Sequence, residues 1–230
     1  MPLYLIPTFL SENFHVLPDK VIEIASQLDE FIVENEKSAR KFLKNINTKI
    51  SQDKLILHVL DEHSTVKEIS MLRDVINQKK NIGLMSESGC PAIADPGAAM
   101  VKLAHSINVK VIPLTGPSSI TLALMASGLN GQSFIFHGYL PRENANRKTK
   151  LKLIEKEALK KKQTQIFIET PYRNLQMLAD IIETCEENTM LCVACDLTSS
   201  DEFIQTKTIG KWKNNIPEIN KKPAIFLIGE

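Results

Sequence analysis

The sequence predicts an α/β protein made of two successive α/β domains. Short apolar runs alternate with longer amphipathic stretches from the first residue to about residue 137, which is typical of parallel strands joined by helical crossovers. Near the end, three predicted strands follow one another with few helical residues between them, which indicates a mixed sheet. A length of 230 residues is sufficient for two small domains, each with its own core.

The first domain is predicted over residues 1–138, with apolar runs as strands and amphipathic stretches as helices. The expected strands are 3–7, 30–34, 55–58, 82–86, 109–113 and 133–138. The expected helices are 18–28, 38–45, 66–79, 98–107 and 118–127. Ser64 and Thr65 precede the third helix and Glu68 follows, which predicts a capping box at its start.

Residues 139–146 are polar and turn-rich, and they are predicted to link the first domain to a second one over 147–230. The second domain is expected to begin with a basic helix. The elements predicted after it are a strand at 165–169, a helix at 172–185 and strands at 190–197, 203–209 and 224–229.

The composition indicates a soluble globular protein. Hydrophobic residues make up 43% and charged residues 24%, and no run approaches the roughly 18 apolar residues of a membrane span. Residues 1–7 lack a basic region and a small-residue cleavage site, so they are predicted to form a first strand and not a signal peptide. A cytoplasmic location is expected.

The four cysteines are irregularly spaced and do not suggest a disulfide framework. Cys192 and Cys195 form a C-x-x-C pattern, which is found in metal knuckles and redox pairs. They lie within a predicted strand, where residues three apart face opposite sides. We therefore expect them in the core and predict no metal site.

The net charge of +1 gives the protein no overall positive field that would attract nucleic acid. Basic residues are nevertheless concentrated in one predicted helix, whose only acidic residues are Glu155 and Glu157. This helix is either a solvated face or a surface that contacts phosphates. Its basic residues are Arg147, Lys148, Lys150, Lys152, Lys156, Lys160, Lys161 and Lys162.

Two Pro/Gly-rich loops indicate a ligand site. Residues 86–97 follow one predicted strand and open a helix, and residues 113–121 do the same after the next strand. Gly89 and Gly97 permit backbone angles that other residues avoid. Ligands of α/β proteins bind where strands end in such loops, although a tight connection without a ligand is the alternative for either loop alone.

Together with three further segments, the two loops resemble the tetrapyrrole methylase superfamily of S-adenosylmethionine-dependent methyltransferases. The three segments are Phe136-His-Gly-Tyr-Leu-Pro-Arg142, Ile168-Glu-Thr-Pro-Tyr-Arg173 and residues 223–229. The likeness is greatest to the branch that methylates ribose 2′-hydroxyls of cytidines in bacterial 16S rRNA. The resemblance implies two α/β domains, a cofactor folded in the cleft between them, a homodimer and a ribosomal RNA substrate. Methylation of a small tetrapyrrole-like molecule, or cofactor binding without catalysis, are the alternatives.

The resemblance also implies which residues bind the cofactor. For Ser118 and Ser119, at the start of a predicted helix, ordinary helix capping is the alternative to cofactor binding. The implied residues are Ser88, Gly89, Ala92, Ile93, Ala94, Ser118, Ser119, Ile120, Leu197 and Ala224.

Transfer to a hydroxyl requires removal of its proton, and Glu87 is the best placed candidate for a general base, ahead of His63 and Lys37. Glu87 could instead cap the helix or bind the cofactor ribose. Relatives have Ser-Asp-Ala-Gly where this chain has Ser86-Glu-Ser-Gly89, and their glycine-containing first loop corresponds to residues 7–13, which contain no glycine.

Three basic residues near the predicted linker are candidates to steer an RNA backbone, which predicts binding that weakens with salt. They are Arg142, Arg147 and Lys148.

Overall fold

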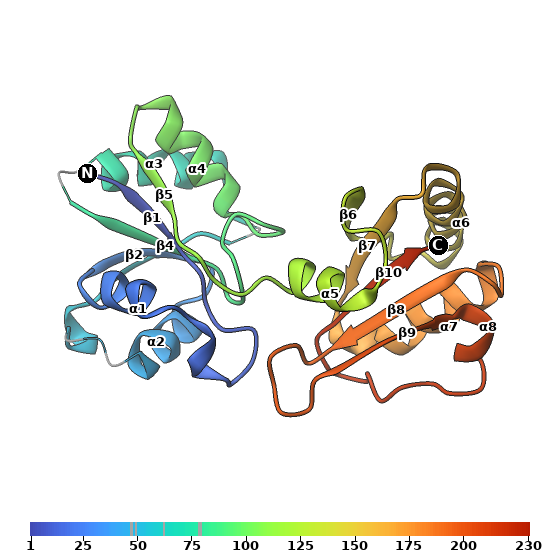
Figure 1. Cartoon of the computed structure of the whole chain (residues 1–230). Coiled ribbons are helices and arrows are strands. Elements are labelled where there is room, and N and C mark those ends of the chain that lie inside the picture. Colours follow the sequence, from blue (N-terminus) through green and yellow to red (C-terminus); the bar gives the residue numbers. More distant parts are fainter. Residues whose placement is uncertain (47, 49, 62, 78–79) are drawn as a thin grey trace. The chain divides into compact units, whose positions relative to one another are not determined.

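The computed structural model describes residues 1–46, 48, 50–61, 63–77 and 80–230. The chain divides into two compact units, residues 1–118 and residues 119–230 (Figure 1). Each unit contains a sheet of five strands among the described residues, with helices packed on it.

The sheet of the first unit is parallel throughout and has the strand order β3-β2-β4-β1-β5. Because parallel neighbours need crossover connections, each strand is followed by helical chain, as the alternating sequence pattern predicts. The strands are β1 (Leu3–Ile6), β2 (Glu30–Val33), β3 (Ile56–Val59), β4 (Ile82–Met85) and β5 (Val111–Pro113).

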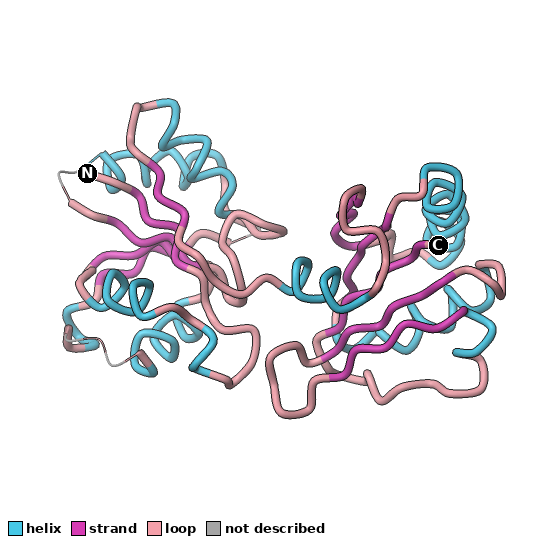
Figure 2. The backbone as a smooth tube through the Cα atoms, in the orientation of Figure 1, coloured by secondary structure: helices cyan, strands magenta, loops and turns pink. Residues whose placement is uncertain are grey.

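Helices cover both faces of this sheet, as Figure 2 shows in cyan around the magenta strands. In β2, Phe31 and Val33 belong to the apolar cluster that contains α1 and α2, whereas Ile32 belongs to the cluster that contains α3 and α4. The strand is therefore buried on both faces. The helices are α1 (Asp19–Ser26), α2 (Glu36–Asn45), α3 (Val66–Asn77) and α4 (Gly97–Ser106), with short 3₁₀ turns at Phe14–Val16 and Gln52–Lys54.

The connections from β1 and β4 leave these neighbouring strands in opposite directions. The chain passes from β1 across the position of β4 to reach β2, and from β4 across the position of β1 to reach β5. Such a reversal is a topological switch point, where the loops at the carboxyl ends of the two strands separate and leave room for a ligand.

The predicted capping box at the start of α3 is confirmed. The Thr65 amide and hydroxyl both donate to Oε2 of Glu68, at 2.6 and 2.8 Å, and the Glu68 amide lies 3.3 Å from the Thr65 hydroxyl. These bonds to Thr65 hold the pKa of Glu68 below its usual value. The predicted end of this helix, residues 78–79, lies outside the described residues.

The second unit has a mixed sheet, as predicted, with the strand order β6-β7-β10-β8-β9. β6 is parallel to β7, whereas β10 is antiparallel to both β7 and β8, and β8 is antiparallel to β9. The strands are β6 (Phe134–Tyr139), β7 (Thr164–Glu169), β8 (Met190–Cys195), β9 (Phe203–Thr208) and β10 (Ala224–Gly229).

One apolar core joins three helices to this sheet. It contains Leu151 from α6, Ile181 from α7 and Trp212 from α8, together with Phe167 and Phe226, whose rings stack at 5.8 Å. The helix α5 packs against β9 and β10. The helices are α5 (Ser119–Ser127), α6 (Asn144–Lys161), α7 (Asn174–Thr184) and α8 (Ile209–Trp212), with a 3₁₀ turn, η3, at Pro171–Arg173.

The boundary between the units differs from the predicted one. The sequence predicts a first domain that extends to residue 138, but the first unit ends at Ser118, and β6 pairs with β7 in the second sheet. Residues 139–146 are therefore not an interdomain linker. They contain the turn between β6 and α6 and the start of α6, inside a β6-α6-β7 unit. The alternating pattern continues unchanged from one sheet to the next, so it does not mark the boundary.

The two cysteines of the C-x-x-C pattern lie in β8 and are buried, as predicted. Burial raises the pKa of both thiols, that of Cys195 to about 11. Within the described residues, no group of three or more His, Cys, Asp or Glu side chains is arranged to hold a metal ion. Every helix in the described part of the chain is too short or too polar to cross a membrane.

Candidate active site

Three loops at the carboxyl edge of the first sheet contact one another. They follow the adjacent strands β4, β1 and β5. The amide of Thr8 donates to the Gly89 carbonyl at 2.9 Å, and the hydroxyl of Ser88 donates to the Phe9 carbonyl at 3.3 Å. The thiol of Cys90 lies 3.4 Å from the carbonyl of Pro117. The two loops expected to bind a ligand are thus held together, with the first loop of the chain beside them.

Two glycines make this close contact possible. A Cβ atom on Gly116 would lie 2.2 Å from Cβ of Pro7, so only glycine permits the loop after β5 to approach the loop after β1. Gly89 has a φ of 76°, a left-handed conformation that favours glycine. The cluster of loops therefore depends on the residue type at both positions.

The loop after β4 is organised by Asp95, which sequence analysis did not single out. Its Oδ1 accepts hydrogen bonds from the amides of Ala92, at 2.8 Å, and Gly97, at 2.7 Å. Ala92 and Ala94 have φ angles of 67° and 60°, which are costly for residues with a Cβ. The carboxylate thus holds a strained loop, and strain of this kind is concentrated at functional sites.

The other oxygen of Asp95 lacks a partner. Its Oδ2 is buried and forms no hydrogen bond with any described residue. Burial raises the pKa of this carboxyl, although the amides of Gly97 and Ala92 act in the opposite direction. Gly97 itself is not left-handed, contrary to the expectation from sequence. A Cβ there would lie 2.8 Å from Oδ1 of Asp95, so close packing explains this glycine.

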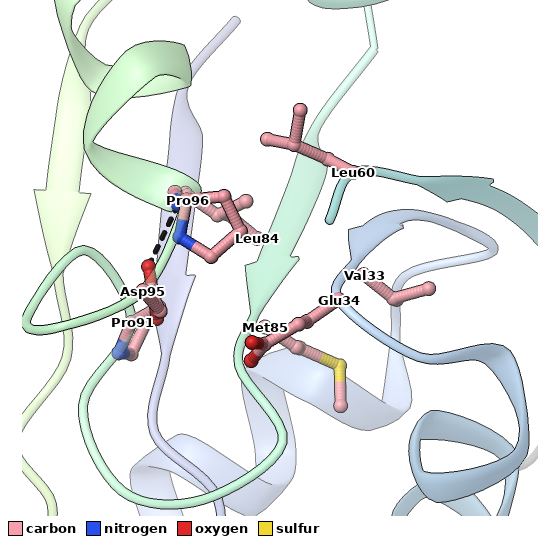
Figure 3. A pocket seen from close by; sticks show the side chains of 9 residues that line it. Val33, Glu34, Leu60, Leu84, Met85, Pro91, Asp95 and Pro96 are labelled. Carbon is pink, nitrogen blue, oxygen red and sulfur yellow. Dashed lines mark hydrogen bonds between the residues drawn. The ribbon is translucent and has the colours of Figure 1, made fainter. Parts of the chain in front are cut away.

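A small pocket lies between the carboxyl ends of β2 and β4, with Glu34 and Asp95 on its wall (Figure 3). Oε2 of Glu34 accepts a hydrogen bond from the amide of Glu87 at 3.0 Å. Sequence analysis also missed Glu34, although its position directly after a buried strand was a usable signal. The residues that line the pocket are Val33, Glu34, Leu60, Leu84, Met85, Pro91, Asp95, Pro96 and Gly97.

The predicted acid–base residues lie at different distances from these loops. Glu87 is exposed in the loop after β4, and its amide is fixed by Glu34. His63 is exposed after β3, two strands away from β4, which corresponds to about 10 Å across the sheet. Lys37 lies in the first turn of α2, where its amide donates to the capping side chain of Asn35. The structure thus places Glu87 among the contacting loops, and His63 and Lys37 outside them.

The residues predicted to bind the cofactor fall in both units. In the first unit, Ser88 and Gly89 take part in the contacts between loops, and Ile93 and Ala94 are exposed beside them. Ala92 belongs to the strained segment, and Ser118 is the last residue of the unit.

In the second unit, Ser119 and Ile120 form the first turn of α5. Ala224 begins β10 and pairs with Cys195, the last residue of β8, and Leu197 follows two residues later. Leu197 and Ala224 therefore share one edge of the second sheet, and both are buried. Left-handed backbone at Asp196 and Thr198, with φ angles of 50° and 71°, makes the chain turn sharply around Leu197.

The basic helix α6 is only partly available to a ligand. Arg147 is 4% exposed and its Nε donates to Asp180 at 2.6 Å, so the prediction that it steers RNA is wrong. Lys148 pairs with Glu183 at 2.6 Å. Arg142 is exposed in the turn before α6, and the exposed lysines of the helix are Lys152, Lys156, Lys160 and Lys161.

Comparison with known proteins gives one consistent class. The family model of the tetrapyrrole (corrin/porphyrin) methylases matches residues 17–212. The crystal structure of the methyltransferase CobJ has a TM-score of 0.64 at 15% identity, over 100% of this chain and 94% of that one, so the fold is shared.

Curated relatives are similar over most of their length. The ribosomal RNA small subunit methyltransferase I of Buchnera aphidicola subsp. Schizaphis graminum is 31% identical over 229 residues, which cover 98% of this chain and 77% of the relative. The proteins of the same name from Vibrio cholerae and Bacillus subtilis are each 33% identical, over 88% and 92% of this chain and 67% and 70% of theirs.

The fold and these matches define an enzyme of the methyltransferase class. Within this class the chain belongs to the tetrapyrrole (corrin/porphyrin) methylase family, which confirms the resemblance seen in the sequence.

Proposed function

We propose that this protein is an S-adenosylmethionine-dependent methyltransferase that acts on small-subunit ribosomal RNA, with a ribose 2′-hydroxyl as acceptor. One observation carries the proposal: relatives named ribosomal RNA small subunit methyltransferase I align with 98% of the chain. The contacting loops at the switch point of the first sheet provide a suitable place for the ligand.

The residues present fit S-adenosylmethionine. This molecule carries an amine and ribose hydroxyls, which need acceptors, and the buried Oδ2 of Asp95 is an acceptor without a partner among the described residues. Backbone groups of residues 89–94 in the strained loop, with Ser88, would hold it from the first unit. From the second unit we propose that Ser119, Ile120, Leu197 and Ala224 bind the cofactor. We propose the same role for Ser118, the last residue of the first unit.

The bound cofactor would supply the methyl group, and the chain has to position the acceptor and remove its proton. Glu87 is exposed in the central loop, and the bond from its amide to Glu34 fixes its backbone. We assign proton removal to the carboxylate of Glu87. His63 is the less suitable base, because it follows β3, two strands away from the strand β4 that precedes Glu87.

The proposal includes a homodimer in the cytoplasm, where ribosomal subunits are assembled. The family resemblance supports the dimer, and light scattering coupled to gel filtration of the purified protein tests it. A mass near 25.8 kDa, that of one chain, would contradict the dimer.

The central experiment has two parts. Calorimetry with S-adenosylmethionine measures binding, and transfer of a labelled methyl group is then measured on small ribosomal subunits from a strain that lacks this gene. Mapping of the labelled nucleotide identifies the acceptor. We expect binding in the first part and one labelled ribose in the second. Binding without transfer would favour a protein that has lost catalysis, and transfer to tetrapyrroles but not to RNA would favour a small-molecule enzyme.

A further inference from the structure

Tyr172 has the most exposed aromatic side chain in the described part of the chain, at 77%. It lies in η3, directly after β7. Its side chain forms no hydrogen bond or ring contact with another described residue. The only tryptophan, Trp212, is by contrast completely buried. An isolated ring of this size on the surface has apolar area that the fold itself does not use.

The turn that carries Tyr172 is rigid. Oε1 of Glu169, whose side chain is 1% exposed, accepts hydrogen bonds from the amide of Thr170 at 2.6 Å and from Nε of Arg173 at 3.1 Å. The amide of Arg173 closes the turn on the Thr170 carbonyl at 2.9 Å. Because both neighbours of the Pro171-Tyr172 pair are fixed, the ring is displayed from a stable position.

Cationic residues lie beside this turn. The amide of Lys221 donates to the Pro171 carbonyl at 3.0 Å, so Lys221 is next to the segment that carries Tyr172. Lys221 is exposed and has no ion-pair partner among the described residues, whereas Lys222 pairs with Asp196 at 3.1 Å. Arg173 keeps 31% of its side chain exposed. An open aromatic face is thus accompanied by an unneutralised cation.

The turn lies at the same sheet edge as two residues proposed to bind the cofactor. Ala224 pairs with both Glu169, the last residue of β7, and Cys195, the last residue of β8. Tyr172 follows Glu169 by three residues, and Leu197 follows Cys195 by two. A substrate held at Tyr172 is therefore on the edge where the methyl donor is expected.

We propose that Tyr172 is a stacking platform for an unpaired base of the RNA substrate, with Lys221 binding an adjacent phosphate. An exposed aromatic ring combined with cations is how proteins hold single-stranded RNA, because every base has a face that stacks and every nucleotide a phosphate. The inference rests on the proposed ribosomal RNA methyltransferase function and identifies where the chain contacts the flanking nucleotide.

The test uses the full chain and a fluorescently labelled single-stranded RNA of about ten nucleotides. Tyr172→Ala is expected to weaken RNA binding about tenfold, and Tyr172→Phe, which keeps the ring, less than about twofold. Lys221→Gln is expected to reduce the slope of log affinity against log salt by about one. Phe134→Ala is the matched control, because Phe134 is 45% exposed at the opposite, amino end of β6. It should not change RNA binding.

Methyl transfer to small ribosomal subunits distinguishes this inference from the proposed function. For Tyr172→Ala we expect a raised KM for RNA, with unchanged affinity for S-adenosylmethionine. If the wild type transfers no methyl group to RNA, the proposed function is wrong. If it does, and Tyr172→Ala binds RNA as the wild type does, the stacking platform is wrong. Loss of binding to intact subunits but not to free RNA would instead identify a protein contact and overturn the stacking role.

Discussion

Asp180 holds Arg147 by an ion pair in the interior of the second unit, with Nη2 of the arginine 2.5 Å from Oδ2 and side-chain exposures of 5% and 1%. The other oxygen of Asp180 accepts bonds from Asn144 and Gln176. Nη1 of Arg147 donates to the carbonyl of Arg142 at 2.6 Å. One pair thus connects the turn after β6, the helix α6 and the helix α7.

Replacement of Asp180 is expected to destabilise the second unit strongly. Asp180→Ala leaves a buried guanidinium without its counter-charge, which costs about 3–5 kcal/mol. Urea denaturation followed by circular dichroism measures the loss. The control is Lys148→Ala, which removes the surface pair with Glu183 and should change the free energy of unfolding by less than about 1 kcal/mol. Equal effects of the two substitutions would contradict the structural role of Asp180.

Glu87→Gln tests the assignment of the general base. The amide side chain has the same shape but does not take up the acceptor proton, so turnover should fall about a hundredfold or more. Affinity for S-adenosylmethionine, measured by calorimetry, should stay within about threefold because binding is assigned mainly to backbone groups. Glu218→Gln, an exposed glutamate of the second unit, is the control for charge. Full turnover by Glu87→Gln would exclude Glu87 as the base.

Gly116→Ala tests the close approach of two loops at the proposed site. The new methyl group would overlap the ring of Pro7, so one loop has to move, at a cost of about 1–3 kcal/mol. We expect a lower melting temperature and weaker binding of S-adenosylmethionine. Gly131→Ala is the matched control, because a Cβ there meets no atom within 4 Å. Unchanged binding by Gly116→Ala would separate the loop after β5 from the ligand site.

Asp95 predicts a pH-dependent contribution to stability. Burial raises the pKa of its carboxyl above the ordinary 3.8, so the ionised form is penalised in the folded state. This penalty is complete at neutral pH and disappears as the pH falls through the raised pKa. Asp95→Asn carries no charge at any pH. The unfolding free energy of the wild type minus that of the variant should therefore increase from pH 7 to pH 4, as measured by urea denaturation.

The buried thiols predict a dependence of the same sign at high pH, because their pKa values are also raised in the folded state. Burial, with the charge of Glu155, raises the pKa of Cys185 to about 12, and burial, with Asp196, raises that of Cys195 to about 11. These thiols stay protonated when folded but ionise near pH 9 when unfolded. Their stabilising contribution is present below pH 9 and is lost between about pH 9 and 12.

Alkylation with iodoacetamide tests directly whether these cysteines are buried. At pH 8, Cys185, Cys192 and Cys195 should remain unmodified in the folded protein and react fully in urea. Mass spectrometry of peptides locates the modified residues. Rapid modification of Cys195 without denaturant would contradict its burial in β8.

Much of the fold follows from local pattern. Buried strands appear as short apolar runs, and β10 has the bounds predicted for it, 224–229. The boundary at Ser118 could not be predicted in this way, because it depends on β6 pairing with β7, and both sheets are built from the same alternation.

The wrong and missing predictions at the site also arise from contacts between segments that are distant in the sequence. Arg147 counts as a free cation in the sequence because its partner, Asp180, lies on another helix. Glu34 and Asp95 share a pocket only because β2 and β4 are neighbours, although β3 separates them along the chain. The motif-bearing loops could be recognised from the sequence, whereas the polar residues that organise them depend on strand order.

The position of β1 between β4 and β5 determines when the first unit can fold during synthesis. Leu3 pairs with Ile82 and with Val111, so the first strand has no partner in the sheet until β4 has been synthesised, and its second partner, β5, follows later still. The apolar N-terminal segment therefore remains unpaired while all the residues up to β4 emerge. Sheet formation in this unit is non-local, which is expected to make it comparatively slow and to leave the apolar first strand exposed during synthesis.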